Sequence, residues 1–154
     1  MSALPVLPLD AIFSGANTLA LMSWLALIAL PRWQSLRLVL QVGVVLSMCL
    51  LYAVLIQAYF FKVEGGGFFS LVAVQTLFTS REVALAGWIH YLAFDLFVGL
   101  WIAKRADLMD LSRWLQAPIL TTTFMFGPIG LTAFAVVVLA KRLSESRFSH
   151  RRSG

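Results

Sequence analysis

The chain has 154 residues, of which 60% are hydrophobic and only 12% are charged. A soluble domain of this length has too much surface for that ratio, and a disordered chain would carry more charge. Twelve Lys and Arg against seven Asp and Glu give a net charge of +5. Five of the twelve follow Ala140 and no basic stripe lies within an apolar segment, so nucleic-acid binding is not indicated. We therefore predict a small protein embedded in the lipid bilayer.

Four apolar stretches have the length needed to cross a bilayer, which takes about 20 residues. They are residues 11–30, 38–61, 82–103 and 117–140. The first ends at Pro31 and lacks the basic residues that precede the core of a signal peptide. The last contains Gly127 and Pro128, and a proline there predicts a kinked helix.

The connecting segments are short. Residues 68–79 are apolar but too few to cross alone, so they predict an interfacial or re-entrant segment. Residues 105–116 predict a helical turn at the membrane surface, with Trp114 at the depth of the headgroups. The expected fold is all-α: a polytopic membrane helix bundle of four transmembrane helices plus the short segment. We expect one domain over residues 1–143 and a basic tail over 144–154.

The distribution of positive residues gives a weak prediction of orientation. With four crossings both chain ends share a side, which then holds seven Lys and Arg against five on the other. This small excess favours both ends on the cytoplasmic side. If residues 68–79 also crossed, the N-terminus would lie outside and the excess would be larger.

The third stretch carries two polar residues near the centre of the bilayer, His90 and Asp95. A charged side chain at this depth costs about 2.5–3.5 kcal/mol on insertion scales. Both should therefore face the bundle interior or a polar cavity. Five residues separate them, which places them about 140° apart around a helix. They are candidate catalytic groups that do not form a direct pair.

His90 shares a helix face with three aromatic residues, Phe94, Phe97 and Trp101. The histidine fits three roles: a hydrogen bond between helices, acid–base chemistry at a ligand, or axial ligation of haem or a chlorophyll-type pigment. The aromatic face fits either ordinary packing or a wall for an apolar ligand. A second histidine occurs only at His150, so a bis-histidine haem would need another chain.

Asp95 falls on another face, together with Trp88. No Lys or Arg lies deep in any stretch, so this carboxyl group is either a functional acid or part of a hydrogen-bonded cluster. Its expected donors are on other helices: Asn17, Gln41, Tyr52, Gln57, Tyr59 and the threonines at 121–123. Glycines at 87, 99, 127 and 130 are expected to allow close helix approach.

Several kinds of site are not indicated. Cys49 is the sole cysteine, which excludes an internal disulfide and a thiolate cluster. Two histidines are too few for the histidine clusters of membrane di-iron enzymes, and no phosphate-binding glycine loop or zinc motif occurs. We predict no metal site.

Motifs in a fixed order resemble one known family. They are residues 69–71, 77–80, 86–97 and 127–131, and the specific part is the block formed by His90, Phe94 and Asp95. This order is similar to that of the abscisic-acid-deficient-four-like family of small membrane proteins, whose plant members are needed to make the allenic carotenoid neoxanthin from an epoxide. The resemblance covers residues 11–140.

The resemblance implies a link to xanthophyll or related isoprenoid metabolism in a bacterial inner or photosynthetic membrane. His90 and Asp95 would then perform acid–base isomerisation or open an epoxide around an apolar isoprenoid ligand. Trp88, Phe94, Phe97, Trp101 and Gln57 are the residues expected to bind it. Carotenoid is the first candidate for a bound pigment, and haem or chlorophyll at His90 the second. The alternative is a non-catalytic accessory subunit of a larger pigment–protein or electron-transfer complex.

Overall fold

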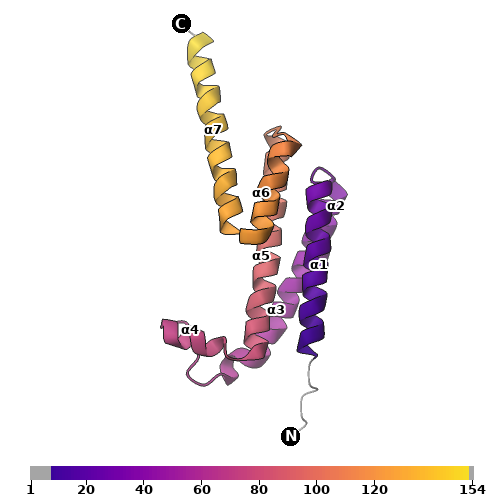
Figure 1. The fold of residues 1–154 in the computed structure, drawn as a ribbon, viewed down its shortest axis with the longest axis vertical. Coiled ribbons are helices and arrows are strands. Elements are labelled where there is room, and N and C mark those ends of the chain that lie inside the picture. Colours follow the sequence, from indigo (N-terminus) through magenta and orange to yellow (C-terminus); the bar gives the residue numbers. More distant parts are fainter. Residues whose placement is uncertain (1–7, 153–154) are drawn as a thin grey trace.

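A computed structural model describes the backbone of residues 8–152 and the side chains of residues 8–144. Within this part of the chain every regular element is a helix and no strand occurs, which confirms the all-α fold class. Figure 1 shows the elements in space. In chain order they are α1 (Leu9–Ala29), α2 (Gln34–Leu38), the π-helix η1 (Val39–Val45), α3 (Leu46–Tyr59), the 3₁₀ turn η2 (Phe60–Lys62), α4 (Leu71–Leu77), α5 (Arg81–Leu108), α6 (Arg113–Phe126) and α7 (Pro128–Arg152).

Three long helical segments form the body of the protein. Leu9–Ala29, the continuous run Gln34–Lys62 and Arg81–Leu108 are each long and apolar enough to cross a membrane. They correspond to the first three predicted stretches. The third helix ends five residues beyond the predicted end at 103, since residues 104–108 are also helical.

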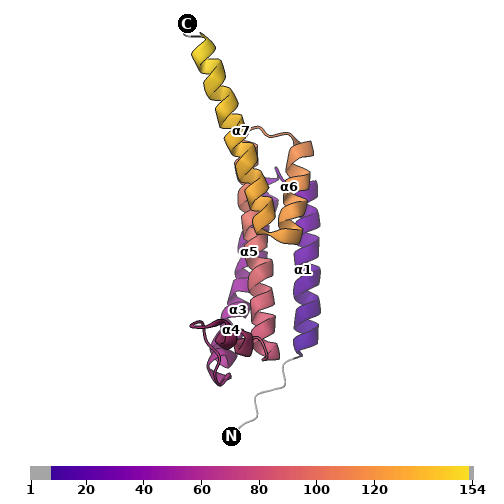
Figure 2. The same ribbon diagram turned by 60° about the vertical axis from the view of Figure 1, so that its left-hand side comes forward.

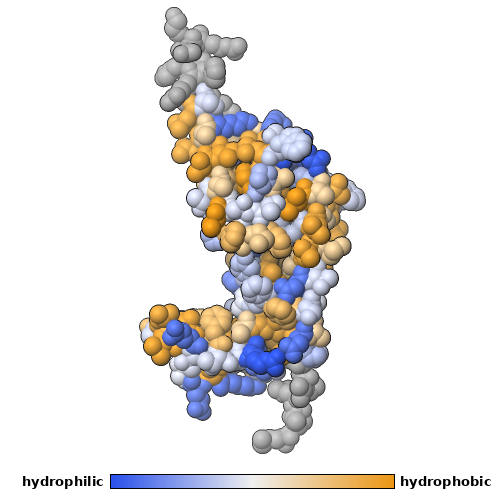
Figure 3. Space-filling model, in the orientation of Figure 1, coloured by the Kyte–Doolittle hydropathy of each residue, from blue (hydrophilic) through white to orange (hydrophobic). Residues whose placement is uncertain are grey.

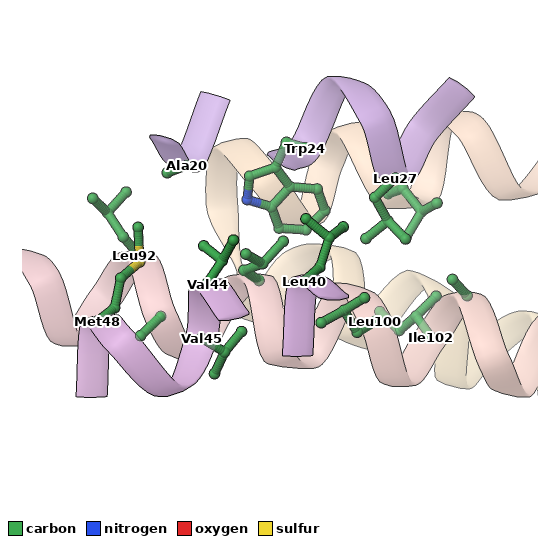
Figure 4. Packing of buried hydrophobic residues seen from close by; sticks show 14 of the residues in the cluster. Ala20, Trp24, Leu27, Leu40, Val44, Val45, Met48, Leu92, Leu100 and Ile102 are labelled. Atoms are coloured by element: carbon green, nitrogen blue, oxygen red, sulfur yellow. The ribbon is translucent and has the colours of Figure 1, made fainter. Parts of the chain in front are cut away.

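The core lies where α1, η1, α3 and α5 meet. Trp24 of α1 is almost fully buried (Figure 4). Its indole ring faces Gly99 of α5. A Cβ atom at Gly99 would lie only 2.7 Å from Cζ3 of this ring. The glycine therefore lets the largest side chain of the core pack directly against the α5 backbone, as expected for close helix approach.

The second long segment contains an irregularity. Its residues Val39–Val45 form a π-helix between the α-helical parts α2 and α3. Leu40, Val44 and Val45 from this segment are buried against the other two long helices (Figure 4). A π-helical turn holds more residues than an α-helical turn, so it changes the angle at which α2 and α3 present their side chains.

The fourth predicted stretch, 117–140, does not form one kinked helix. The chain reverses direction at Gly127, which has a positive φ of 24°, and α6 and α7 form a hairpin (Figures 1 and 2). Gly130 allows the two arms to approach, since a Cβ there would lie 2.5 Å from Cα of Thr123. A proline at the first position of α7 suits a helix start, because its nitrogen has no proton to leave unpaired. The four-helix transmembrane arrangement is thus not confirmed.

The two ends of the bundle differ. We call the end with the turns at 30–33 and 109–112 the upper end, and the end with residues 60–80 the lower end, as drawn in Figure 1. At the lower end the predicted short segment forms α4, which begins at Ser70, whose hydroxyl accepts a hydrogen bond from the Ala73 N–H at 3.1 Å. Seven residues are too few to cross a bilayer, as expected.

Candidate functional site

Below the α6–α7 turn, one side of α5 is left uncovered. In Figure 1 the turn lies beside the middle of α5 and α4 lies beside its lower end, and Figure 3 shows the surface hollowed between them. We call this surface the open face of α5. Its members are at least partly exposed to the surroundings of the bundle and are Trp88, His90, Tyr91, Phe94 and Asp95.

His90 forms one border of the open face, on the side of α3 and α4. Its imidazole ring stacks on Phe94, with ring centroids 4.4 Å apart, and lies 5.2 Å from the ring of Tyr52 on α3. It borders a cavity of about 220 Å³. Aromatic side chains from α3 and the lower end make up much of the cavity wall, namely Tyr52, Phe60, Phe68 and Phe78. His90 is thus an exposed polar group beside an apolar cavity, and not a residue of the bundle interior.

Asp95 forms the other border, at the tip of the hairpin. Its carboxyl group packs against Gly127, where a Cβ atom would lie 2.9 Å from Cγ of Asp95. Its Oδ2 atom is buried and has no hydrogen-bond partner among the described residues. Because buried polar atoms are nearly always paired in folded proteins, this unpaired oxygen marks Asp95 as a candidate for contact with a ligand.

Tyr91 lies between the two borders, one helical turn before Asp95. Its hydroxyl donates a hydrogen bond to the Met125 carbonyl at 3.3 Å, close to the end of α6. It also interacts electrostatically with the Asp95 carboxyl. Tyr91 therefore connects α5 to the hairpin and supplies a second oxygen beside Asp95.

His90 and Asp95 do not contact each other, as their spacing predicts. His90 packs towards α3, whereas Asp95 packs towards the α6–α7 turn. Along the helix axis five residues separate them by about 7.5 Å. A ligand lying across Tyr91 and Phe94 would reach both groups, so the open face is the surface on which the two could act together.

The expected hydrogen-bond donors to Asp95 lie elsewhere. Asn17 accepts a bond of 3.0 Å from Nε1 of Trp88, and the hydroxyl of Thr123 donates to Ile119 within its own helix. Tyr52 instead packs against His90, with the two rings tilted by 50°. Those donor predictions were wrong, because the chain reversal at Gly127 brings backbone and not polar side chains to the carboxyl group.

The remaining predicted ligand-binding residues are distributed over three places. Trp88 lies on the α1 side of the open face, with its ring 5.3 Å from that of Tyr91. Phe97 and Trp101 continue the exposed line of His90 and Phe94 upwards, and Trp101 meets Phe134 of α7 edge to face at 5.7 Å. Gln57 is exposed on α3 and is not among the residues lining the His90 cavity.

The site contains no cluster suited to a metal ion. Over the described residues, no three His, Cys, Asp or Glu side chains lie together. The cavity beside His90 is smaller than the roughly 300–1,000 Å³ typical of pockets for drug-sized ligands. Both Tyr52 and Phe94 pack against the imidazole of His90.

Sequence reasoning missed two members of the site. Tyr91 could have been found, since a residue four positions before Asp95 lies on the same helix face. Gly127 was expected to permit close approach, and it does, but its neighbour could not be inferred from a pattern that indicated one continuous helix. The partner of Asp95 followed only from the reversal of the chain.

The structure defines a class of protein: a helical protein with three helices able to cross a membrane and a polar site beside a helical hairpin. The chain belongs to the ABA DEFICIENT 4-like family, whose model matches residues 11–134. This confirms the resemblance that the sequence motifs indicated. No curated protein and no solved structure matches the chain.

Proposed function

We propose that this protein crosses the membrane three times and acts on a carotenoid-type isoprenoid that lies on the open face of α5. Family membership supports the link to xanthophyll metabolism. The observation that carries the proposal is the open face itself: an apolar, aromatic surface with His90 at one border and Asp95 at the other. Such a surface suits a long apolar molecule with one polar, reactive end.

The chemistry that fits these groups is acid–base isomerisation. Asp95 would donate a proton to an epoxide oxygen as the carbon–oxygen bond breaks, and His90 would accept the proton that leaves a neighbouring carbon. The proton then returns from His90 to Asp95 through solvent, so product and substrate are isomers and no oxidant or reductant is needed. Tyr91 would position the Asp95 carboxyl group and the hairpin tip.

The test is product formation in a carotenoid-producing host that carries single variants. General acid–base groups contribute about 10²–10⁴-fold to a rate, so Asp95→Asn and His90→Gln should each lower product by at least about 100-fold at equal protein level. Gln41→Ala is the control, because Gln41 is exposed on the second long helix and lies outside the open face. Unchanged product in both site variants would refute the catalytic proposal.

Binding is measured separately from chemistry. The purified Asp95→Asn variant should still retain a carotenoid, visible in its absorption spectrum and identified after solvent extraction. Loss of the pigment together with product would make Asp95 a binding residue. A wild-type protein that retains no pigment and converts none would remove the isoprenoid proposal altogether.

A second function is a non-catalytic subunit of a membrane pigment–protein or electron-transfer complex. One observation favours it: α7 leans away from the bundle (Figures 1 and 2) and exposes large apolar side chains, including Ile129, Val136 and Leu139. Under this alternative, deletion of residues 144–154 should release the protein from larger partners during purification. Retention of the shortened chain in a complex would exclude those residues as the point of attachment.

A further inference from the structure

The basic residues of this chain gather at one end of the bundle. Because α6 and α7 turn back at Gly127, the whole C-terminal part of α7 projects from the upper end (Figure 1). Ten of the twelve positive residues therefore belong to that end. They are Arg32, Arg37, Lys104, Arg105, Arg113, Lys141 and Arg142, together with positions Arg147, Arg151 and Arg152 of the α7 backbone.

The lower end has a different balance of basic and acidic residues. It carries two basic residues, Lys62 and Arg81, and three acidic ones, Asp10, Glu64 and Glu82. The upper end also has three acidic positions, at 107, 110 and 145, so its net charge is +7 against −1 below. With Asp95 in the middle these values account for the whole +5 of the chain.

Residue counts along α5 and along α7 agree on how far the hairpin reaches along the bundle. Asp95, which meets the turn, lies 14 residues after the start of α5 and 13 before its end, about 20 Å from each. On α7, Lys141 lies 13 residues after Pro128, and its amino group donates to the Met109 carbonyl just beyond the end of α5. The hairpin therefore reaches about halfway along α5 and returns to the upper end.

Some of the basic residues at the upper end already bind acidic or carbonyl groups within the protein. Arg37 pairs with Asp107, to which Arg32 also lies at 3.3 Å, and Arg113 donates to the Ala29 carbonyl. Three others, Lys104, Arg105 and Arg142, are exposed and form no ion pair with any described side chain. These three are free to meet an anion outside the protein.

Two exposed tryptophans lie at the same end of the bundle as these basic residues. Trp33 and Trp114 are exposed at the upper end, to 57% and 93% respectively. Tryptophan is enriched at the depth of lipid headgroups, where its ring is half in the apolar phase. The free cations and the two indole rings therefore lie at the same end of the bundle, as expected for a membrane interface.

We propose that the upper end is a docking surface for the anionic phospholipid headgroups of the cytoplasmic leaflet. This rests on the three membrane crossings proposed above. Positive loops remain on the cytoplasmic side, and anionic lipids there attract basic residues. The N-terminus is then outside, the C-terminus inside, the hairpin enters from the cytoplasm, and the His90 cavity lies in the outer half of the bilayer.

The orientation is tested with single cysteines in a Cys49→Ala background in spheroplasts of a bacterial host. Thr79→Cys at the lower end should react with a membrane-impermeant maleimide in intact cells. Ser112→Cys and Ser144→Cys, which flank the hairpin, should react only after permeabilisation. The reverse pattern overturns the orientation. Reaction of Ser144→Cys but not Ser112→Cys in intact cells would show that 117–140 crosses the bilayer, and would overturn the hairpin.

The lipid partner is tested by native mass spectrometry after reconstitution in vesicles of equal phosphatidylglycerol and phosphatidylcholine. The wild-type protein should retain mainly phosphatidylglycerol. Replacing Lys104, Arg105 and Arg142 by Gln should lower the ratio of the two retained lipids at least fivefold. Lys62→Gln, at the lower end, is the control and should leave the ratio unchanged. An unchanged ratio in the triple variant, or an equal fall in the control, would overturn the proposal.

Discussion

The contact between Gly127 and Asp95 gives the sharpest test of the site. Alanine at position 127 would have to adopt a positive φ, and its Cβ atom would press on the Asp95 carboxyl group. The backbone conformation costs about 1–2 kcal/mol for a residue with a side chain, and overpacking at the carboxyl adds about 1–3 kcal/mol. We therefore expect Gly127→Ala to lower the free energy of unfolding by about 2–5 kcal/mol.

The two costs can be separated with a double-mutant cycle. In an Asp95→Ala background the carboxyl group is gone, so Gly127→Ala should retain only the backbone cost. The coupling between the two positions should thus be about 1–3 kcal/mol. Unfolding can be followed by tryptophan fluorescence and circular dichroism during titration of a mild-detergent solution with sodium dodecyl sulfate.

A matched control excludes a general effect of adding a methyl group. Gly15 lies in α1 and a Cβ there would meet no atom within 4 Å, so Gly15→Ala should stabilise the helix by up to about 1 kcal/mol. Equal destabilisation by Gly127→Ala in both backgrounds would refute the contact. The open face would then lose one of its two borders.

Two further predictions concern the packing of α5. Gly99→Ala should destabilise the protein by about 1–2 kcal/mol, because overpacking against the Trp24 ring exceeds the gain in helix propensity. An increase in stability on dodecyl sulfate titration would contradict this contact. Asp107→Asn should cost about 1–3 kcal/mol, because it leaves the largely buried Arg37 without its carboxylate. The same titration measures this loss, and an unchanged midpoint would show that the pair contributes nothing.

The sequence was a good guide to the parts of the fold that depend on length and periodicity. Apolar stretches of about 20 residues predicted four long helices, and the structure contains the first three of them as helices able to cross a membrane. The 3.6-residue period placed His90 and Phe94 on one face and Asp95 on another, and the structure keeps this relation. Both are local properties of a single helix, so they do not depend on how the helices pack.

What the sequence could not supply was the direction of the chain after Gly127. A proline inside an apolar stretch is compatible with a kink or with a new helix, and local propensity does not distinguish them. That choice also determined the neighbours of Asp95 and the side on which the basic residues of α7 lie. One backbone conformation at a glycine thus changed both the site and the expected orientation.

The π-helical segment fixes how the two ends of the second long helix are turned relative to each other. Before it, Arg37 faces Asp107 at the upper end, and after it, Tyr52 faces His90 beside the cavity. Each residue of an α-helix turns the chain by about 100°, and each residue of a π-helix turns it by less, because its hydrogen bonds join residues five apart. If the same seven residues of Val39–Val45 wound as a regular α-helix, one end of the long helix would rotate relative to the other. The ion pair and the aromatic contact could then not both keep their present geometry, so the winding of this segment ties the cavity to the opposite end of the bundle.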